Sequence, residues 1–142
     1  MFQGWIYRVA GFLLFFSAGV LAWTLFGNRE RLLLIGEFHS VAHKGSGQAR
    51  ILATADGRRM LRLLNVRTYP GSDLEVCLVA APDAEDNDTV RQEGFVCLGG
   101  FHPRTGYAAY PLPAGLDLEK YRAVSIWSPE YGVNFTTAPL GH

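Results

Sequence analysis

The chain has 142 residues, with 13 Lys and Arg against 13 Asp and Glu, so its formal net charge is zero. A balanced charge provides no overall positive field, and this disfavours a nucleic-acid-binding role. The 49% hydrophobic content is inflated by an apolar stretch near the start, and the remainder is about the size of one small domain. We therefore expect an anchor with its flanks at residues 1–30 and a single domain at residues 31–142.

The apolar stretch runs over residues 9–26, which are 18 residues without a charged side chain. An α-helix needs about 20 such residues to cross a bilayer, and Ile6 and Tyr7 extend the run to that length. The stretch is longer than a secretory signal and ends in bulky side chains, so we expect a retained transmembrane helix in the lipid bilayer. The arginines on its two sides do not decide its orientation by the positive-inside rule. The anchor includes Val9, Phe12, Leu13, Phe16, Val20, Trp23 and Phe26.

After the anchor, the sequence is typical of an all-β domain. Residues 32–35 form a short apolar piece that either extends the helix or links it to Gly36. Beyond this glycine, short runs rich in Val, Ile, Leu, Phe and Tyr alternate with Gly, Pro, Asp and Asn. The predicted strands lie near 37–43, 47–54, 58–66, 74–80, 94–99, 107–112, 122–128 and 132–138.

No segment between these strands is long enough for a crossover helix, so the pattern predicts an antiparallel β-sandwich or small barrel of about eight strands. Alternation in the second strand places Ala49, Ile51 and Ala53 on one face and Gln48 and Arg50 on the other. The one helical signal in the domain is a single turn that begins at Asp117.

The two cysteines, Cys77 and Cys97, are equidistant from Asn87, the middle of an acidic segment at 82–94. A hairpin that turns there would place them opposite one another on neighbouring strands. In an oxidising compartment this arrangement predicts a disulfide, and the alternative is a pair of reduced, buried cysteines.

Other residues offer weaker candidates for chemistry. His39 and His43 would share a strand face, with His102 approaching from elsewhere, but ordinary hydrogen-bonding histidines are the favoured interpretation. The acidic group in the 82–94 segment lacks the glycine and final glutamate of a calcium loop and reads better as a solvated hairpin tip; it comprises Asp83, Glu85, Asp86 and Asp88. No serine, histidine and aspartate motif frames an acyl-transfer site, so we expect no enzymatic activity. Because the histidine and acidic patterns are weak, we also expect no metal site and no required cofactor.

The C-terminal third carries a family resemblance. Four segments resemble the DM-thirteen domain, also called the electron-transfer DM domain. They are Gly106-Tyr107, Tyr110-Pro111-Leu112-Pro113, the run 116–127 that ends in Ile126-Trp127, and Val133-Asn134-Phe135. Earlier residues agree in order: Gly36-Glu37-Phe38, His43, Gly47, Leu61-Arg62-Leu63 and Gly71-Ser72-Asp73-Leu74-Glu75-Val76. The resemblance covers about residues 36–140.

The resemblance implies an extracytoplasmic β-sandwich, often attached to a membrane, with a proposed role in electron transfer. In the family that role depends on a cysteine directly after the tryptophan of the Ile-Trp motif, and here this position is Ser128. A serine cannot cycle through thiolate, sulfenic acid or disulfide. The resemblance therefore supports the fold and the compartment more than the redox chemistry.

Together these observations predict a single-pass membrane protein with a non-enzymatic domain outside the cytoplasm, periplasmic or extracellular. It would act as a binding or assembly module, or as an accessory subunit of a larger membrane complex such as a respiratory or photosynthetic one. The alternative is an electron-transfer domain with a noncovalently bound haem or metal, held by His39, His43 or His102.

Overall fold

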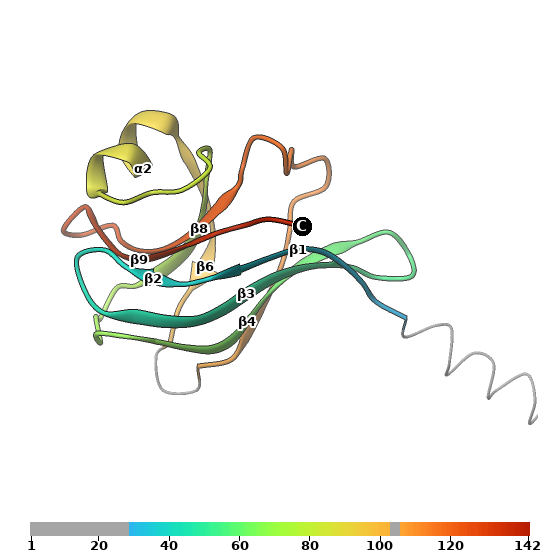
Figure 1. The fold of residues 1–142 in the computed structure, drawn as a ribbon, viewed down its shortest axis with the longest axis horizontal. Coiled ribbons are helices and arrows are strands. Elements are labelled where there is room, and N and C mark those ends of the chain that lie inside the picture. Colours follow the sequence, from blue (N-terminus) through green and yellow to red (C-terminus); the bar gives the residue numbers. More distant parts are fainter. Residues whose placement is uncertain (1–28, 103–105) are drawn as a thin grey trace, which may run out of the picture.

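The computed structural model describes residues 29–102 and 106–142. In these residues the chain forms two antiparallel sheets (Figure 1). The first, which we call the open sheet, has the order β1-β3-β4-β7 and comprises β1 (Arg31–Glu37), β3 (Gly45–Ala53), β4 (Arg59–Thr68) and β7 (Ala108–Pro111). The second, the covered sheet, has the order β2-β9-β8-β5-β6 and comprises β2 (His39–Ser40), β9 (Val133–Pro139), β8 (Ala123–Ser128), β5 (Glu75–Val79) and β6 (Phe95–Gly100).

The two sheets enclose one hydrophobic core, and this makes the domain a β-sandwich rather than a closed barrel. The open sheet contributes side chains that include Ile51, Leu61 and Leu63, and the covered sheet contributes side chains that include Leu78 and Ile126. All five are fully buried. The period of two along a strand explains this contribution, because every second residue of β3 and β4 points into the core.

The covered sheet also has a buried outer face. The helix α2 (Asn87–Glu93) and the segment before it lie over that face, as Figure 1 shows. A second hydrophobic cluster forms there; its members are Cys77, Val79, Ala81, Ala84, Val90, Ala123 and Trp127. As a result all six residues of β8 are buried, whereas burial along β4 largely alternates.

Most predicted strands are confirmed to within two residues at either end. Ala49 and Ile51 share a face as predicted, and the structure shows that both are buried. Two predictions at the start of the domain are wrong. Residues 32–35 are neither a helical extension nor a linker, because they belong to β1, which pairs with β3. The predicted strand at 37–43 reduces to the two-residue β2, because the chain leaves the open sheet after Glu37 and bends at 41–43.

The sequence predicted a solvated hairpin tip for the acidic segment, but the segment contains the helix α2. Asp86 is its N-cap, and its carboxylate accepts a hydrogen bond of 2.7 Å from the backbone N–H of Thr89. Val90 is buried against the covered sheet. A helix this short is unstable by itself in water, so this packing supplies much of its stability. The predicted single turn at Asp117 is present, with the Tyr121 N–H donating to the Asp117 carbonyl at 3.0 Å.

The two sheets are linked at their edges. Ile35 of β1 and Gly141, which follows β9, exchange two backbone hydrogen bonds of 2.8 and 2.9 Å. On the other side, the Tyr110 hydroxyl on β7 donates to the Gly100 carbonyl of β6 at 2.7 Å, and burial raises the pKa of this phenol. These links fix the two layers relative to one another.

The predicted anchor, including Val9, Phe12, Leu13, Phe16, Val20, Trp23 and Phe26, lies outside the described residues. Within residues 29–102 and 106–142, no helix has the length and apolar character needed to cross a membrane.

Candidate functional site

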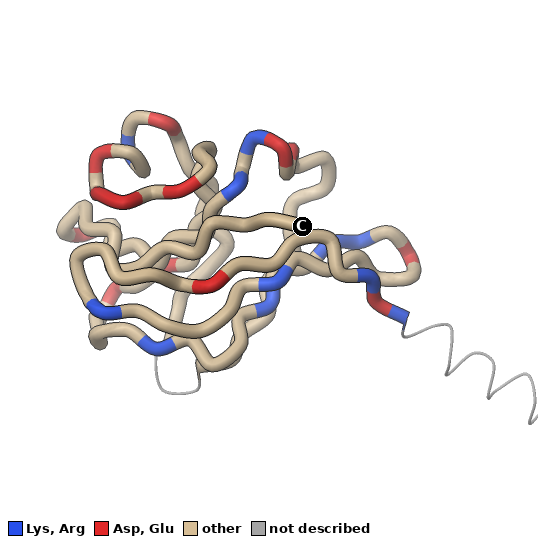
Figure 2. The backbone as a smooth tube through the Cα atoms, viewed as in Figure 1, with Lys and Arg blue, Asp and Glu red and all other residues tan. Residues whose placement is uncertain are grey.

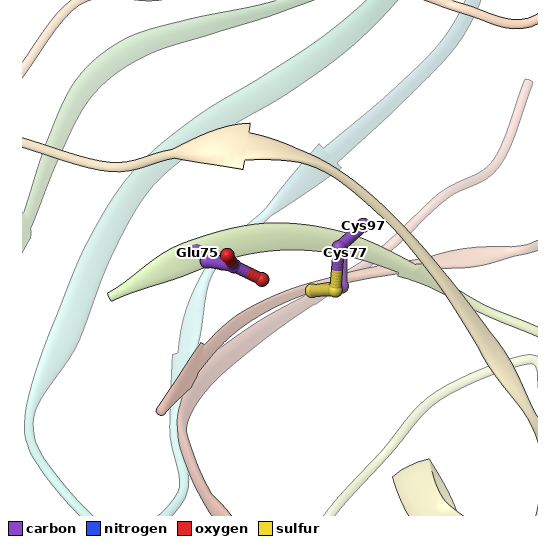
Figure 3. A group of neighbouring side chains, drawn as sticks. All are labelled: Glu75, Cys77 and Cys97. Atoms are coloured by element: carbon purple, nitrogen blue, oxygen red, sulfur yellow. A yellow bond between two sulfur atoms is a disulfide. The ribbon is translucent and has the colours of Figure 1, made fainter. Parts of the chain in front are cut away.

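The disulfide lies on the outer face of the covered sheet, where β5 and β6 pair. Cys77 and Cys97 are partners in the strand register, and their sulfur atoms are bonded, which confirms the predicted pairing (Figure 3). Cys77 is fully buried on the inner strand β5, whereas Cys97 is exposed on β6, at the edge of the sheet. The bond therefore joins a buried strand to an edge strand.

Aromatic and charged side chains surround this bond. Trp127 on β8 lies opposite Glu75 in the strand register and is 4% exposed. The Phe95 ring is tilted against it, with 5.6 Å between ring centroids, and the Arg91 guanidinium lies over its ring at 5.9 Å. Such a cation over an indole face contributes about 0.5–1 kcal/mol at an exposed site.

The only described group of three or more candidate metal ligands is Glu75, Cys77 and Cys97, whose ligand atoms lie within 4.8 Å of one another. Figure 3 shows the Glu75 side chain beside the disulfide on β5. Metals bind thiolates, and here the two sulfurs are bonded to each other instead. In its oxidised form this group therefore does not fit a metal ion.

The histidines named in the alternative prediction do not converge. Both ring nitrogens of His39 face acceptors: Nε2 lies 2.7 Å from the Asp83 carboxylate and Nδ1 lies 3.2 Å from the Ser40 carbonyl. Burial acts to lower the pKa of His39, but these hydrogen bonds outweigh it and the net shift is upward. Both ring nitrogens of His39 are thus engaged by protein oxygen atoms, and neither is directed at a metal site.

His43 lies between two rings, with centroids 4.8 Å from Tyr69 and 4.3 Å from Phe135, and His102 is exposed. Neither joins His39 in a ligand group among the described residues. The arrangement does not fit a haem or metal held by these three side chains.

The acidic residues of the 82–94 segment also have separate roles. Asp83 pairs with His39, Asp86 caps α2, and Asp88 forms an ion pair with Arg91 at 3.1 Å. Glu85 is exposed. Their carboxylates do not form a described ligand group.

Ser128 is fully buried at the end of β8. Its hydroxyl donates to the Asp73 carboxylate at 3.0 Å, and the same carboxylate accepts from the Glu130 N–H at 2.9 Å. The Tyr131 N–H donates to the Ser128 hydroxyl at 3.4 Å. Ser128 thus holds the turn between β8 and β9 against the start of β5.

A buried polar network that sequence reasoning missed centres on Asn134. Its side-chain Oδ1 accepts from the Ser125 hydroxyl at 2.7 Å, and its Nδ2 donates to the Thr137 hydroxyl at 2.7 Å and to the Ala84 carbonyl at 3.3 Å. Its backbone N–H donates to the Asn87 side chain at 2.8 Å. The network fastens the segment before α2 to the covered sheet, and the asparagine inside an apolar strand run was its available signal.

A family model described as electron transfer DM13 matches residues 37–140, which is most of the chain. The chain belongs to the electron transfer DM13 family. Comparison with curated proteins gives no match, and comparison with solved structures gives none either. Membership confirms the resemblance and indicates a DM13 domain related to electron transfer. Ser128, which the resemblance equates with the family's redox cysteine, is buried and hydrogen-bonded, and a serine has no thiol.

Proposed function

We propose that this protein is a membrane-anchored DM13 domain that acts outside the cytoplasm as a non-enzymatic binding or assembly module of an electron-transfer complex. The observation that carries the proposal is the Cys77–Cys97 disulfide, because structural disulfides persist in oxidising compartments. The apolar run at 9–26 supports attachment to the bilayer.

The absence of a converging histidine set among the described residues favours assembly over a resident haem or metal. An accessory subunit of a respiratory or photosynthetic complex is the setting in which we place the module. One anchor and one small domain suit such a subunit.

The side of the membrane can be tested with a membrane-impermeant amine reagent on intact cells. The chain has two lysines, Lys44 and Lys120, and both are exposed on the β-domain. We expect both to be labelled, and a Lys44→Arg/Lys120→Arg variant serves as the matched control. Labelling only after the cells are opened would contradict the proposed location.

Two further measurements test attachment and assembly. The full chain is expected to stay in the membrane pellet during alkaline carbonate extraction and to migrate in a complex larger than itself after mild detergent extraction. Release into the soluble fraction would contradict the anchor. Migration as a detergent-bound single chain would contradict the accessory-subunit role.

A second candidate function follows from the exposure of Cys97. A thiolate can attack an accessible sulfur, and a dithiol donor would then reduce the bond with two electrons and two protons to give two thiols. Titration of the folded protein with dithiothreitol tests this role. Reversible reduction without unfolding would favour a two-electron carrier, whereas reduction only in denaturant would assign the bond to structure.

A further inference from the structure

A groove of about 710 Å³ lies between the start of β1 and the β3–β4 hairpin. Its lining is rich in arginine and we call it the basic groove. The lining consists of Arg29, Glu30, Arg31, Leu33, Ala53, Thr54, Ala55, Gly57 and Arg59. Figure 2 shows the blue residues of this end of the domain and the red residues that gather around α2 at the other.

The basic groove keeps an excess of positive charge after the ion pairs at and beside it are counted. Glu30 accepts two hydrogen bonds of 2.9 Å from Arg62, and this hydrogen bonding holds the pKa of Glu30 below its usual value. Arg58 pairs with Asp56 at 2.9 Å. Among residues 29–102 and 106–142, neither Arg31 nor Arg59 forms an ion pair.

An exposed apolar side chain follows Arg31 in the strand, but it faces the other side of the sheet and does not line the groove. Leu32, the second residue of β1, is 49% exposed although it lies within a strand of the sandwich. The arginines alone suit lipid headgroups, since the guanidinium binds phosphate.

The position of the groove along the chain decides its surroundings. Arg29 lies three residues after Phe26, the last residue of the apolar run. Three residues of extended chain span at most about 11 Å. A lipid headgroup layer is about 5–8 Å thick on each side of the hydrocarbon core. If the run spans the bilayer, the groove therefore lies in or directly above the headgroups.

We propose that the basic groove binds the phosphate groups of anionic phospholipids and so holds the DM13 domain down on the bilayer in one orientation. This inference rests on the proposed membrane anchor and specifies its lipid partner. Arg31 and Arg59 supply the positive charge, and the half-buried Leu33 is the leucine that lines the groove with them.

The test uses the full chain in nanodiscs of phosphatidylcholine alone or of phosphatidylcholine with phosphatidylglycerol. Hydrogen exchange is followed at residues 53–59, with residues 83–93 as an internal reference. In the anionic discs, exchange at 53–59 is expected to slow by at least about fivefold, the factor for one arginine beside an anionic surface. About 1 M salt should remove the difference, because the Debye length is then about 3 Å.

The variant Arg31→Gln/Arg59→Gln should lose the lipid-dependent slowing. Lys44→Gln/Arg67→Gln is the matched control, because it removes the same charge from exposed side chains elsewhere on the domain. If the chain enters the discs and exchange at 53–59 is the same in both lipids, the lipid contact is refuted and the anchor stands. If the chain does not associate with either disc, the anchor itself is refuted, and with it this inference.

Discussion

The two sheets of the sandwich share one core but differ on their outer faces. The open sheet leaves Arg50, Arg62 and Leu64 half-buried on or near its outer face. The covered sheet has a second hydrophobic cluster, a disulfide and the Asn134 network on that side. Strands of the open sheet therefore bury one face, whereas central strands of the covered sheet bury both faces.

This difference indicates which outward-facing residues contribute most to the free energy of unfolding. Residues that face outward from a two-layer sandwich are normally partly solvated, and substitutions there cost little. In the covered sheet the outward residues should behave as core residues. The following predictions test that contrast.

The largest effect is expected at Trp127, which faces outward from β8 and is 4% exposed. Trp127→Ala should lower the free energy of unfolding by about 3–5 kcal/mol, because it leaves a cavity beneath α2. The control is Leu64→Ala in the open sheet, expected to cost less than about 1 kcal/mol. Urea titration of the detergent-solubilised chain measures both, and similar costs would remove the contrast between the sheets.

Loss of the disulfide should come next. Cys97→Ser is expected to cost about 3 kcal/mol, the chain-entropy value for a loop closed by a bond between residues 20 apart in sequence. Reductant should lower the stability of the natural chain by a similar amount and leave the variant unchanged. Intact mass measured with and without reductant reports the bond, because reduction adds two hydrogen atoms. If the mass of the natural chain does not change on reduction, no bridge exists.

Asn134→Ala should cost about 1–3 kcal/mol, because the buried Ser125 hydroxyl and Ala84 carbonyl lose their partner. The control, Gln48→Ala, removes a 3.1 Å hydrogen bond to Arg50 in the open sheet and should cost no more than about 0.5 kcal/mol. Faster hydrogen exchange at 83–93 in Asn134→Ala would show that the network holds α2 in place. Unchanged exchange there would assign the loss to the strand alone.

The smallest effect concerns His39, which links β2 to the segment before α2. Its pKa is raised above 6.5, so the stabilisation is complete below pH 6.5 and is lost as the pH rises through the folded-state pKa. Both side chains are about one-third exposed, so the contribution should stay well below about 1 kcal/mol. NMR titration of His39 should give a lower pKa in Asp83→Asn than in the natural chain, and equal values would exclude the pair as the cause.

The same contrast between sheets explains what the sequence could predict. Alternation in β3 predicted that Ala49 and Ile51 share a face, and in the structure that face points into the core. The spacing of Cys77 and Cys97 about Asn87 predicted their pairing even though α2 replaces the expected hairpin tip.

Local patterns could not show that α2 folds back over β8. That packing depends on Val90 and Asn134, which are 44 residues apart and carry no periodic signal of their own. For the same reason Arg31 and Arg59 could not be placed around one groove before the pairing of β1 with β3 was known.

The bridge between Ile35 and Gly141 has a practical consequence for where a purification tag can be attached. Removing the last two residues would open the seam between the layers, so purification tags belong after His142 with a spacer rather than in place of Gly141.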